Sequence, residues 1–529
     1  MRRIKVILLI AFILSCSQLK SEEWVRIYSN NMFLYPSWVI ETYDKGYLML
    51  INSTDINNMS IYLWLVKTDI NGNKLWEKSI GTGQDAISFS NVEETLDHGY
   101  ILAGAFSKYG GPYFDPAIIK LNSCGELDWC NVIKTQGVTS DFATRVKPTP
   151  EGDYILLTLY SNPDADSCIQ LFKFNGNGNL IWKHSYFPDS LIWEPQCEDV
   201  RVDDDGYLIS ASCYYPDPGN PTIGWERPYY IKTDTAGNLK WWLVYGSGNG
   251  FHGFIGDATI KSKSGNFYSI GWHSNYCDTP VLVKCSGNGQ ESYFQDLIPG
   301  TCPGGVSCIN FLNDTTMITF AGGTINNEFI QRWMKIDTMG VCNYYKEYSE
   351  SWMTSTQHTV KTYDKKFISI ARFNSIYTYL YKLNSSLEYD SVYTRPFTYD
   401  SLCPGGVVSD TINPDCDLIV HIEDPERETG SCQMKVFPNP AMGRVTVVFP
   451  MCLKQTMKQP GISSTSVTYQ WRSTLLEAFD LNGRRVFSQQ IPKSQQTFEI
   501  NVSDWSRGMY YFRIVYNKNK VADTKVLLQ

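Results

Sequence analysis

Acidic side chains are the first residues of this sequence to consider for acid–base chemistry, and the paired ones stand in turns. Asp203-Asp204-Asp205 and Glu93-Glu94 are carboxyl pairs of the kind that general acid–base catalysis uses. Both groups lie at or beside a repeated turn pattern, where acids are ordinary turn formers. We therefore interpret them as solvated turn residues and predict no catalytic residue from them.

Patterns of metal ligands are weak in this sequence. Asp69 begins a run that resembles the start of a calcium loop, but Ile80 stands at the twelfth position, where such a loop has glutamate. No CxxC pair occurs and the six histidines are scattered, which argues against zinc. His252 and His273 lie near Trp272, where packing or a loop role is the more common explanation than an aromatic pocket. We expect neither a metal nor a cofactor.

Sequence motifs of known hydrolases and nucleotide-binding enzymes are also missing. There is no GxSxG elbow, no GxxxxGK phosphate loop and no SxDxGxxW box of sialidase propellers. Residues far apart in the sequence can still meet in the fold, so enzymatic activity stays undecided. Any site must be held by a large fold, because 529 residues exceed one ordinary hydrophobic core.

Charge is unevenly distributed along the chain. The net charge is -8, but residues 24–433 carry 29 basic and 47 acidic side chains, and residues 434–529 carry 13 basic and 5 acidic ones. An acidic body repels phosphate backbones, which argues against a nucleic-acid partner.

The N-terminus has the pattern of a secretory signal. Basic residues at 2–5 precede an apolar run from Val6 to Leu14, and small residues follow at 15–17. This predicts a signal peptide over 1–17, with an apolar run too short to span a membrane. The alternative is lipoprotein processing before Cys16. We expect no transmembrane segment in the mature chain.

Cysteine content agrees with export. Without Cys16, the remaining 14 of the 15 cysteines form an even number, and an oxidising compartment favours disulfides. The short-range candidate pairs are Cys124 with Cys130, Cys302 with Cys308, and Cys403 with Cys416.

A repeat of about 52 residues fills the middle of the chain and predicts its fold. In each unit, Lys is followed five residues later by Gly and four residues after that by Trp or Tyr. The six matching sets are Lys67/Gly72/Trp76, Lys120/Gly125/Trp129, Lys173/Gly178/Trp182, Lys232/Gly237/Trp241, Lys284/Gly289/Tyr293 and Lys335/Gly340/Tyr344, and a shorter copy begins at Lys382.

Each unit reads as two hairpins and therefore four short strands. Four-stranded units of this length, repeated in series, predict an all-β fold with a seven-bladed β-propeller over 24–422. A strand at Trp24 is expected to close the ring against the last blade. The segment from Cys403 resembles an extra first hairpin, so an incomplete eighth blade is the alternative. We expect the aromatic residues to pack between blades, and the repeated lysines to reach solvent or a turn carboxylate.

The repeat resembles the blades of quinoprotein dehydrogenases and related tryptophan-docking propellers. The resemblance rests on Asp69, Gly72 and Trp76 and on their equivalents in later blades. It covers structural positions only and implies no catalytic residue.

A different pattern follows a linker at 423–433. Residues 434–529 alternate in hydrophobicity between Pro, Asn and Gly turns, which predicts a small β-sandwich. They closely resemble the type A sorting domain of the type IX secretion system of Bacteroidetes. The residues that carry this resemblance are Pro438, Asn439, Pro440, Asp480, Gly483, Gly508 and Tyr510. It implies the type IX machinery as a partner, and a protein that is secreted or attached to the cell surface after passing the periplasm.

Three functions remain open for the propeller. We expect a binding or adhesion protein for a glycan or protein; the alternatives are a secreted hydrolase or lyase on polysaccharide or peptide, and a structural envelope component. Fold alone does not choose between them. The fourth blade carries an extra loop, and Trp225, Arg227 and Tyr229 in it are the predicted ligand contacts.

Overall fold

The computed structural model describes most of the chain and divides it into two compact units, Met1–Ile422 and Glu423–Gln529, each of which is considered by itself. The residues described are 22–81, 83, 86–107, 113–134, 140–160, 167–186, 192–217, 220–246, 253–275, 277–297, 306–325, 328–348, 355–394, 399, 403, 407–419, 435–437, 443–448, 474–481, 483–490, 497–516 and 519–528. The predicted signal peptide, Cys16 and the predicted linker lie outside them.

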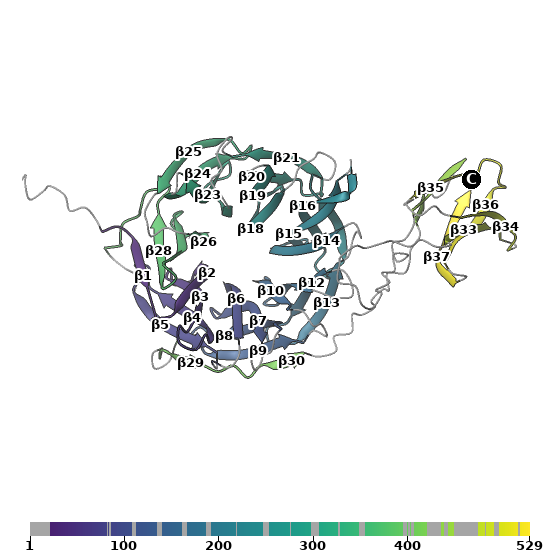
Figure 1. Ribbon diagram of the computed structural model, residues 1–529. Coiled ribbons are helices and arrows are strands. Elements are labelled where there is room, and N and C mark those ends of the chain that lie inside the picture. Colours follow the sequence, from purple (N-terminus) through teal and green to yellow (C-terminus); the bar gives the residue numbers. More distant parts are fainter. Residues whose placement is uncertain are drawn as a thin grey trace, which may run out of the picture. The chain divides into compact units, whose positions relative to one another are not determined.

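The first unit is a ring of four-stranded antiparallel sheets, whose first strands face the centre (Figure 1). Its described residues form seven sheets, one for each repeat, and two of them gain a fifth strand, which is described below. Blades 1 to 3 contain β2 (Phe33–Glu41), β3 (Tyr47–Thr54), β4 (Ile61–Thr68) and β5 (Lys74–Ile80); β6 (Ala86–Glu94), β7 (Tyr100–Ser107), β8 (Asp115–Leu121) and β9 (Leu127–Ile133); β10 (Phe142–Pro148), β11 (Tyr154–Tyr160), β12 (Cys168–Phe174) and β13 (Leu180–Tyr186).

Blades 4 to 7 continue the same order around the ring. They contain β14 (Trp193–Asp203), β15 (Gly206–Asp217), β16 (Asn220–Thr233) and β17 (Leu239–Val244); β18 (Gly253–Lys261), β19 (Phe267–Asn275), β20 (Cys277–Cys285) and β21 (Glu291–Asp296); β22 (Val306–Phe311), β23 (Thr316–Ile325), β24 (Glu328–Asp337) and β25 (Cys342–Tyr348); β26 (Ser355–Lys361), β27 (Phe367–Phe373), β28 (Tyr377–Leu383) and β1 (Val25–Tyr28).

The prediction that an early strand closes the ring is confirmed. β1 takes the outermost place in blade 7, where Val25 pairs with Tyr381 and Tyr28 pairs with Thr378 in antiparallel register (Figure 1). The all-β propeller prediction is therefore confirmed, and its first and last blades are joined by β1.

Aromatic side chains dock each blade on the next one. Trp76 of blade 1 lies against Gly125 in the last turn of blade 2, and Trp129 lies in the same way against Gly178. Trp24, directly before β1, repeats the contact across the closure, where its Nε1–H donates to Ile70 O at 3.0 Å. The glycines in these turns have positive φ (77° at Gly72), a conformation that costs glycine nothing and leaves room for the indole. The expected packing of the aromatic residues between blades is what the structure shows.

After blade 7 the described residues 391–394, 399, 403 and 407–419 lie along blades 1 and 2, and we call these residues the belt. Its two short strands, β29 (Asp410–Ile412) and β30 (Asp417–Ile419), pair in parallel with β5 and β9 on the outside of the ring (Figure 1). The alternative of an extra first hairpin at Cys403 is therefore wrong, because the two strands join the edges of existing sheets.

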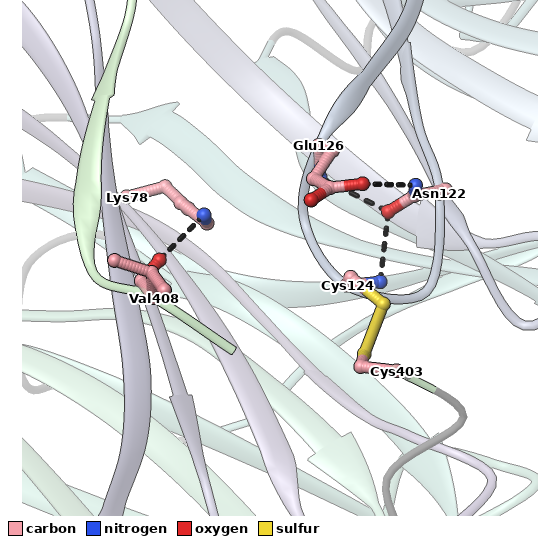
Figure 2. The surroundings of a disulfide bond; sticks show 6 residues. All are labelled: Lys78, Asn122, Cys124, Glu126, Cys403 and Val408. Carbon is pink, nitrogen blue, oxygen red and sulfur yellow. Dashed lines mark hydrogen bonds between the residues drawn. A yellow bond between two sulfur atoms is a disulfide. The ribbon is translucent and has the colours of Figure 1, made fainter. Parts of the chain in front are cut away.

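Disulfides fix the belt to blade 2. Cys403 bonds to Cys124, and Cys416 bonds to Cys130 (Figure 2 shows the first). The predicted short-range pairs Cys124–Cys130 and Cys403–Cys416 are therefore wrong, because the belt brings distant cysteines together. The pair Cys302–Cys308 stays a prediction, since Cys302 lies outside the described residues.

The second unit packs two sheets around one core. β31 (Lys435–Phe437), β32 (Arg444–Val448) and β35 (Thr497–Asn501) form one sheet. The other contains β33 (Thr474–Phe479), β34 (Arg485–Gln490), β36 (Gly508–Tyr516) and β37 (Asn519–Leu528). Val447 and Phe512 belong to the shared core, so the predicted β-sandwich is confirmed. No helix long and apolar enough to cross a membrane occurs in the part of the chain that the structure describes.

Candidate functional site

The two faces of the ring differ in how their loops are built. In blades 1 to 6, strands one and two, and strands three and four, are joined by tight turns such as 42–46 and 69–73 in blade 1, and in blade 7 the turn at 362–366 joins β26 to β27. Antiparallel order places both turns on one face, which we call the turn face. The connections between strands two and three, and between blades, lie on the opposite face, which we call the connection face. The loops of the connection face vary in length from blade to blade.

Five of the repeated lysines, Lys67, Lys120, Lys173, Lys232 and Lys382, pair with a carboxylate in the first turn of their own blade. Lys67 is 3% exposed, and its Nζ lies 2.8 Å from Asp44 Oδ2 in the first turn of the same blade. Lys382 of blade 7 meets Asp364 in the same manner. Burial lowers the pKa of both ammonium groups, and the turn carboxylates partly offset that effect. These lysines therefore brace the two turns of a blade and do not line a ligand site.

The carboxylate of the calcium-like loop also serves its own turn. Asp69 Oδ1 accepts backbone hydrogen bonds from Asn71 and Asn73, both at 2.8 Å. Among the residues described, no group of three or more His, Cys, Asp and Glu side chains is arranged to hold a metal ion.

A cluster at the centre of the ring was not predicted from the sequence. Trp38 of β2 stacks on His358 of β26, with ring centroids 3.4 Å apart and an interplanar angle of 16°. The Arg145 guanidinium, from β10, lies 4.6 Å from the centroid of the Trp38 ring. These three buried side chains come from blades 1, 3 and 7, so they meet across the axis.

Two carboxylates balance the charge of this axial cluster. Glu93 of β6 pairs with Lys147, and Asp199 of β14 lies 3.9 Å from Arg145. Burial raises the pKa of Asp199, and the charges of Lys147 and Arg145 oppose that shift. Burial and the same two cations hold the pKa of His358 well below its usual range, so its imidazole is neutral at pH 7. Two carboxylates thus face two cations, with Arg145 and Asp199 buried and Lys147 and Glu93 partly exposed.

The first strand of each blade carries the feature from which the axial cluster could have been predicted. Each of β2, β6, β10 and β26 has an irregularity in its register, directly before Trp38, Asn91, Arg145 and His358. These residues therefore occupy equivalent positions in their blades. Aligning the first strands of all repeats would have placed them in one layer, although their chain separation reaches 320 positions.

The predicted contact patch in blade 4 is only partly at the surface. Trp225 is 37% exposed, but Arg227 and Tyr229 are buried, at 0% and 1%. All three lie on β16, which enters the blade at Arg227: Tyr229 belongs to the core, and Arg227 donates to Gly246 O. Direct ligand contact by Arg227 and Tyr229 is therefore wrong for this conformation, because the blade covers both side chains. Trp225 stays a predicted contact.

The outer part of the same hairpin carries the residues that sequence reasoning missed. β15 and β16 are 12 and 14 residues long. Trp225 pairs with Tyr215 and Glu226 pairs with Tyr214 across the two strands. Burial raises the pKa of Glu226 to about 7. Aromatic rings and a carboxyl group thus share the part of blade 4 that extends toward the connection face.

A second aromatic group lies where blades 7 and 1 meet on the connection face. Tyr35 of β2 is 43% exposed, and the guanidinium of Arg372 lies 4.1 Å from its ring centroid. Arg372 Nη2–H also donates to Ser375 Oγ at 2.8 Å, in the connection between β27 and β28. Tyr377, at the start of β28, is exposed and stacks near Phe373, with centroids 6.3 Å apart.

In the second unit, the residues predicted as sorting motifs form turns. Gly483 has a φ of 76° and its N–H donates to Asp480 O at 3.0 Å, which closes the β33–β34 hairpin. Tyr510 is buried, and its hydroxyl donates to Ser506 O at 2.8 Å, just before Gly508. Pro438, Asn439 and Pro440 lie outside the described residues.

Residues 435–529 match the protein family described as "Secretion system C-terminal sorting domain". The second unit is a type IX secretion sorting domain. This sorting domain marks the protein for export, followed by secretion or attachment at the cell surface. The match lies within the second unit and says nothing of the propeller. No curated protein matches the chain.

Solved structures with similar folds include proteins of different activities. An ulvan lyase is 10% identical, with 67% of this chain and 95% of that chain covered and a TM-score of 0.42. Drosophila semaphorin 2a is 10% identical, with 96% and 98% covered and a TM-score of 0.40. An α-L-arabinanase of Penicillium chrysogenum is 9% identical, with 68% and 98% covered and a TM-score of 0.38. Similarity at this level carries no inference about activity.

Proposed function

We propose that this exported protein binds an extracellular glycan on the connection face of its propeller. The observation that carries the proposal is the pairing of aromatic rings with charged groups there, Tyr35 with Arg372 and Tyr214 with Glu226, together with the exposed ring of Trp225 on the same hairpin. Sugar rings present apolar C–H faces that pack on aromatic rings, and hydroxyl groups that bond to carboxylates and guanidinium groups. Binding sites commonly combine such aromatic surface with a few polar groups that fix orientation.

The axial cluster supports a binding protein more than an enzyme. Its acids and bases are paired with one another, and Arg145, Asp199 and His358 are also buried, whereas a general acid or base must lie within hydrogen-bond reach of a substrate proton. The aromatic groups of the connection face are accessible to a ligand without any rearrangement.

The test is a panel of soluble neutral and acidic polysaccharides, with affinity measured by calorimetry for the parent protein and three variants. Tyr35→Ala and Trp225→Ala should each weaken binding about tenfold, the loss that a buried aromatic contact at an interface typically causes. Tyr363→Ala is the matched control, because Tyr363 is 44% exposed but stands in a tight turn of the turn face.

Two outcomes contradict the proposal. Equal affinity of Tyr35→Ala, Trp225→Ala and the parent would exclude the connection face as the glycan site. New reducing ends or unsaturated sugars in the incubated polysaccharide would instead support the alternative of a secreted hydrolase or lyase.

A further inference from the structure

We infer that the belt is a second, covalent closure of the propeller ring, which acts at the same joint as β1. Consecutive blades are joined by the chain itself at every step except from blade 7 back to blade 1. At that joint β1, which precedes blade 1, pairs with β28 through non-covalent contacts. The belt begins directly after blade 7 and crosses to blades 1 and 2.

Both closures converge on one turn of blade 1. Ile70 O accepts the hydrogen bond from Trp24 Nε1, and the N–H of Ile70 donates to the hydroxyl of Tyr399 in the belt. Beside it, Asn71 exchanges two hydrogen bonds with the backbone of Tyr393, at 2.7 and 3.0 Å. A movement of β1 away from this turn therefore disturbs the belt, and the reverse also holds.

Beyond this turn the belt is anchored along the outside of blades 1 and 2. Lys78 Nζ, on β5, lies 2.7 Å from Asp410 Oδ1 and donates to Val408 O at 2.6 Å (Figure 2 shows the second contact). β29 then extends the sheet of blade 1, and β30 extends that of blade 2. The propeller and the belt are thus joined by an ion pair and by backbone hydrogen bonds, in addition to the disulfides.

The disulfides convert this contact into a closed covalent circuit. Cys124 and Cys403 are 279 positions apart, and Cys130 and Cys416 are 286 apart. The circuit leaves blade 2, passes through blades 3 to 7 and returns to blade 2 through the belt. If β1 leaves β28, blade 7 is still tethered to blade 2, so the ring cannot open widely. Cross-links that close long loops in this way restrict the unfolded chain most strongly.

A different role would be a simple tether that holds the segment before the sorting domain. The two roles differ in one measurable respect. A lock on the ring must be energetically coupled to β1, whereas a tether acts independently of it. Sites without shared partners show additive effects, and sites in one network do not.

The experiment measures unfolding rates of the full oxidised chain in urea by tryptophan fluorescence. Trp24→Ala weakens the closure by β1, and Cys403→Ser with Cys416→Ser removes both belt disulfides. We expect Trp24→Ala to accelerate unfolding about tenfold more in the protein without belt disulfides than in the parent. A ratio of about threefold or less would overturn the lock and leave a tether.

Trp241→Ala is the matched control. Trp241 docks on Gly289 between blades 4 and 5, a joint that the chain itself spans. Its effect on the unfolding rate should be equal, within about twofold, with and without the belt disulfides.

If the variant without belt cysteines does not fold, the comparison uses folded parent and folded Trp24→Ala protein before and after treatment with dithiothreitol. Each disulfide then takes up two electrons and two protons to give two thiols, and dithiothreitol is oxidised to its cyclic disulfide. The same two ratios support or overturn the lock.

Discussion

The indole of Trp129 lies directly against Gly178 of the next blade: a Cβ added to Gly178 would come 2.8 Å from Trp129 Cδ2. The Nε1–H of Trp129 also donates to Gly176 O at 3.1 Å, so the ring is held by packing and by one hydrogen bond. Equivalent contacts join Trp76 to Gly125 and Trp241 to Gly289. Gly125, Gly178 and Gly289 are thus docking surfaces as well as turn residues.

Gly178→Ala should lower the free energy of unfolding by about 2–3 kcal/mol. Part of this cost is the positive φ of 81°, and the rest is the clash with Trp129. Urea denaturation provides the measurement. Gly265→Ala is the matched control, since Gly265 has a φ of 85° but nothing within 4 Å of its added Cβ, and its cost should be about 1 kcal/mol. Equal costs at both positions would contradict a docking role.

Lys67→Met should destabilise the protein by about 2 kcal/mol, because it leaves the partly buried Asp44 carboxylate without its cation. Lys263→Met should change stability by less than about 0.5 kcal/mol, since Lys263 and its partner Asp314 are both exposed. Chemical denaturation of both variants at pH 7 checks the difference. Similar small effects would mean that the repeated lysines do not brace the turns.

Glu41 should make the protein less stable as the pH rises. Burial raises its pKa to about 7, and the N–H of Tyr363 and the charges of Lys382 and Lys45 only partly oppose this shift. The unfolded carboxyl ionises near pH 4.5, so between about pH 4.5 and 7 the folded state holds more protons, and stability falls with rising pH.

Glu41→Gln removes the ionisable carboxyl group and therefore this contribution to the pH dependence of stability. We expect the variant to gain about 1 kcal/mol relative to the parent between pH 5 and pH 8, after allowance for partial exposure of the carboxyl group. Denaturation at a series of pH values measures the gain. A constant difference between parent and variant across that range would contradict the predicted ionisation.

Arg145 and Asp199 should show strong coupling in a double-mutant cycle. Either Arg145→Met or Asp199→Asn leaves an uncompensated charge in the buried axial cluster, whereas the double variant removes both charges. We expect the double variant to be at least about 1 kcal/mol more stable than the sum of the single effects predicts. Additive effects would show that these two groups do not balance each other at the axis.

The repeating features of the fold were readable from the sequence because they are local. The spacing of Lys67, Gly72 and Trp76 recurs in six repeats, so it predicts one strand, one turn and the next strand in each of them. The closing role of the strand at Trp24 followed from counting strands. The C-terminal domain was recognisable because its turns, including Asp480 to Gly483, carry their own residue preferences.

Features that depend on contacts around the ring were not readable. Cys124 pairs with Cys403 because the belt runs backward over blade 2, and no local spacing reports that path. Arg227 is a charged residue of the type common at binding surfaces, but β16 continues into the blade and buries its side chain. His358 and Trp38 meet only after seven sheets have curved into a ring. In each case the missing information is the three-dimensional path of the chain.

The pairing of β1 with β28 has a consequence for biosynthesis. Val25 is made near the start of the chain, but its partner Tyr381 follows 356 residues later, and the sorting domain comes later still. A ribosome that stops before β28 therefore releases a product whose β1 has no partner strand and which lacks the sorting domain. The partner strand that closes the ring and the sorting domain are both synthesised late, so a truncated chain lacks both and is not recognised by the secretion machinery.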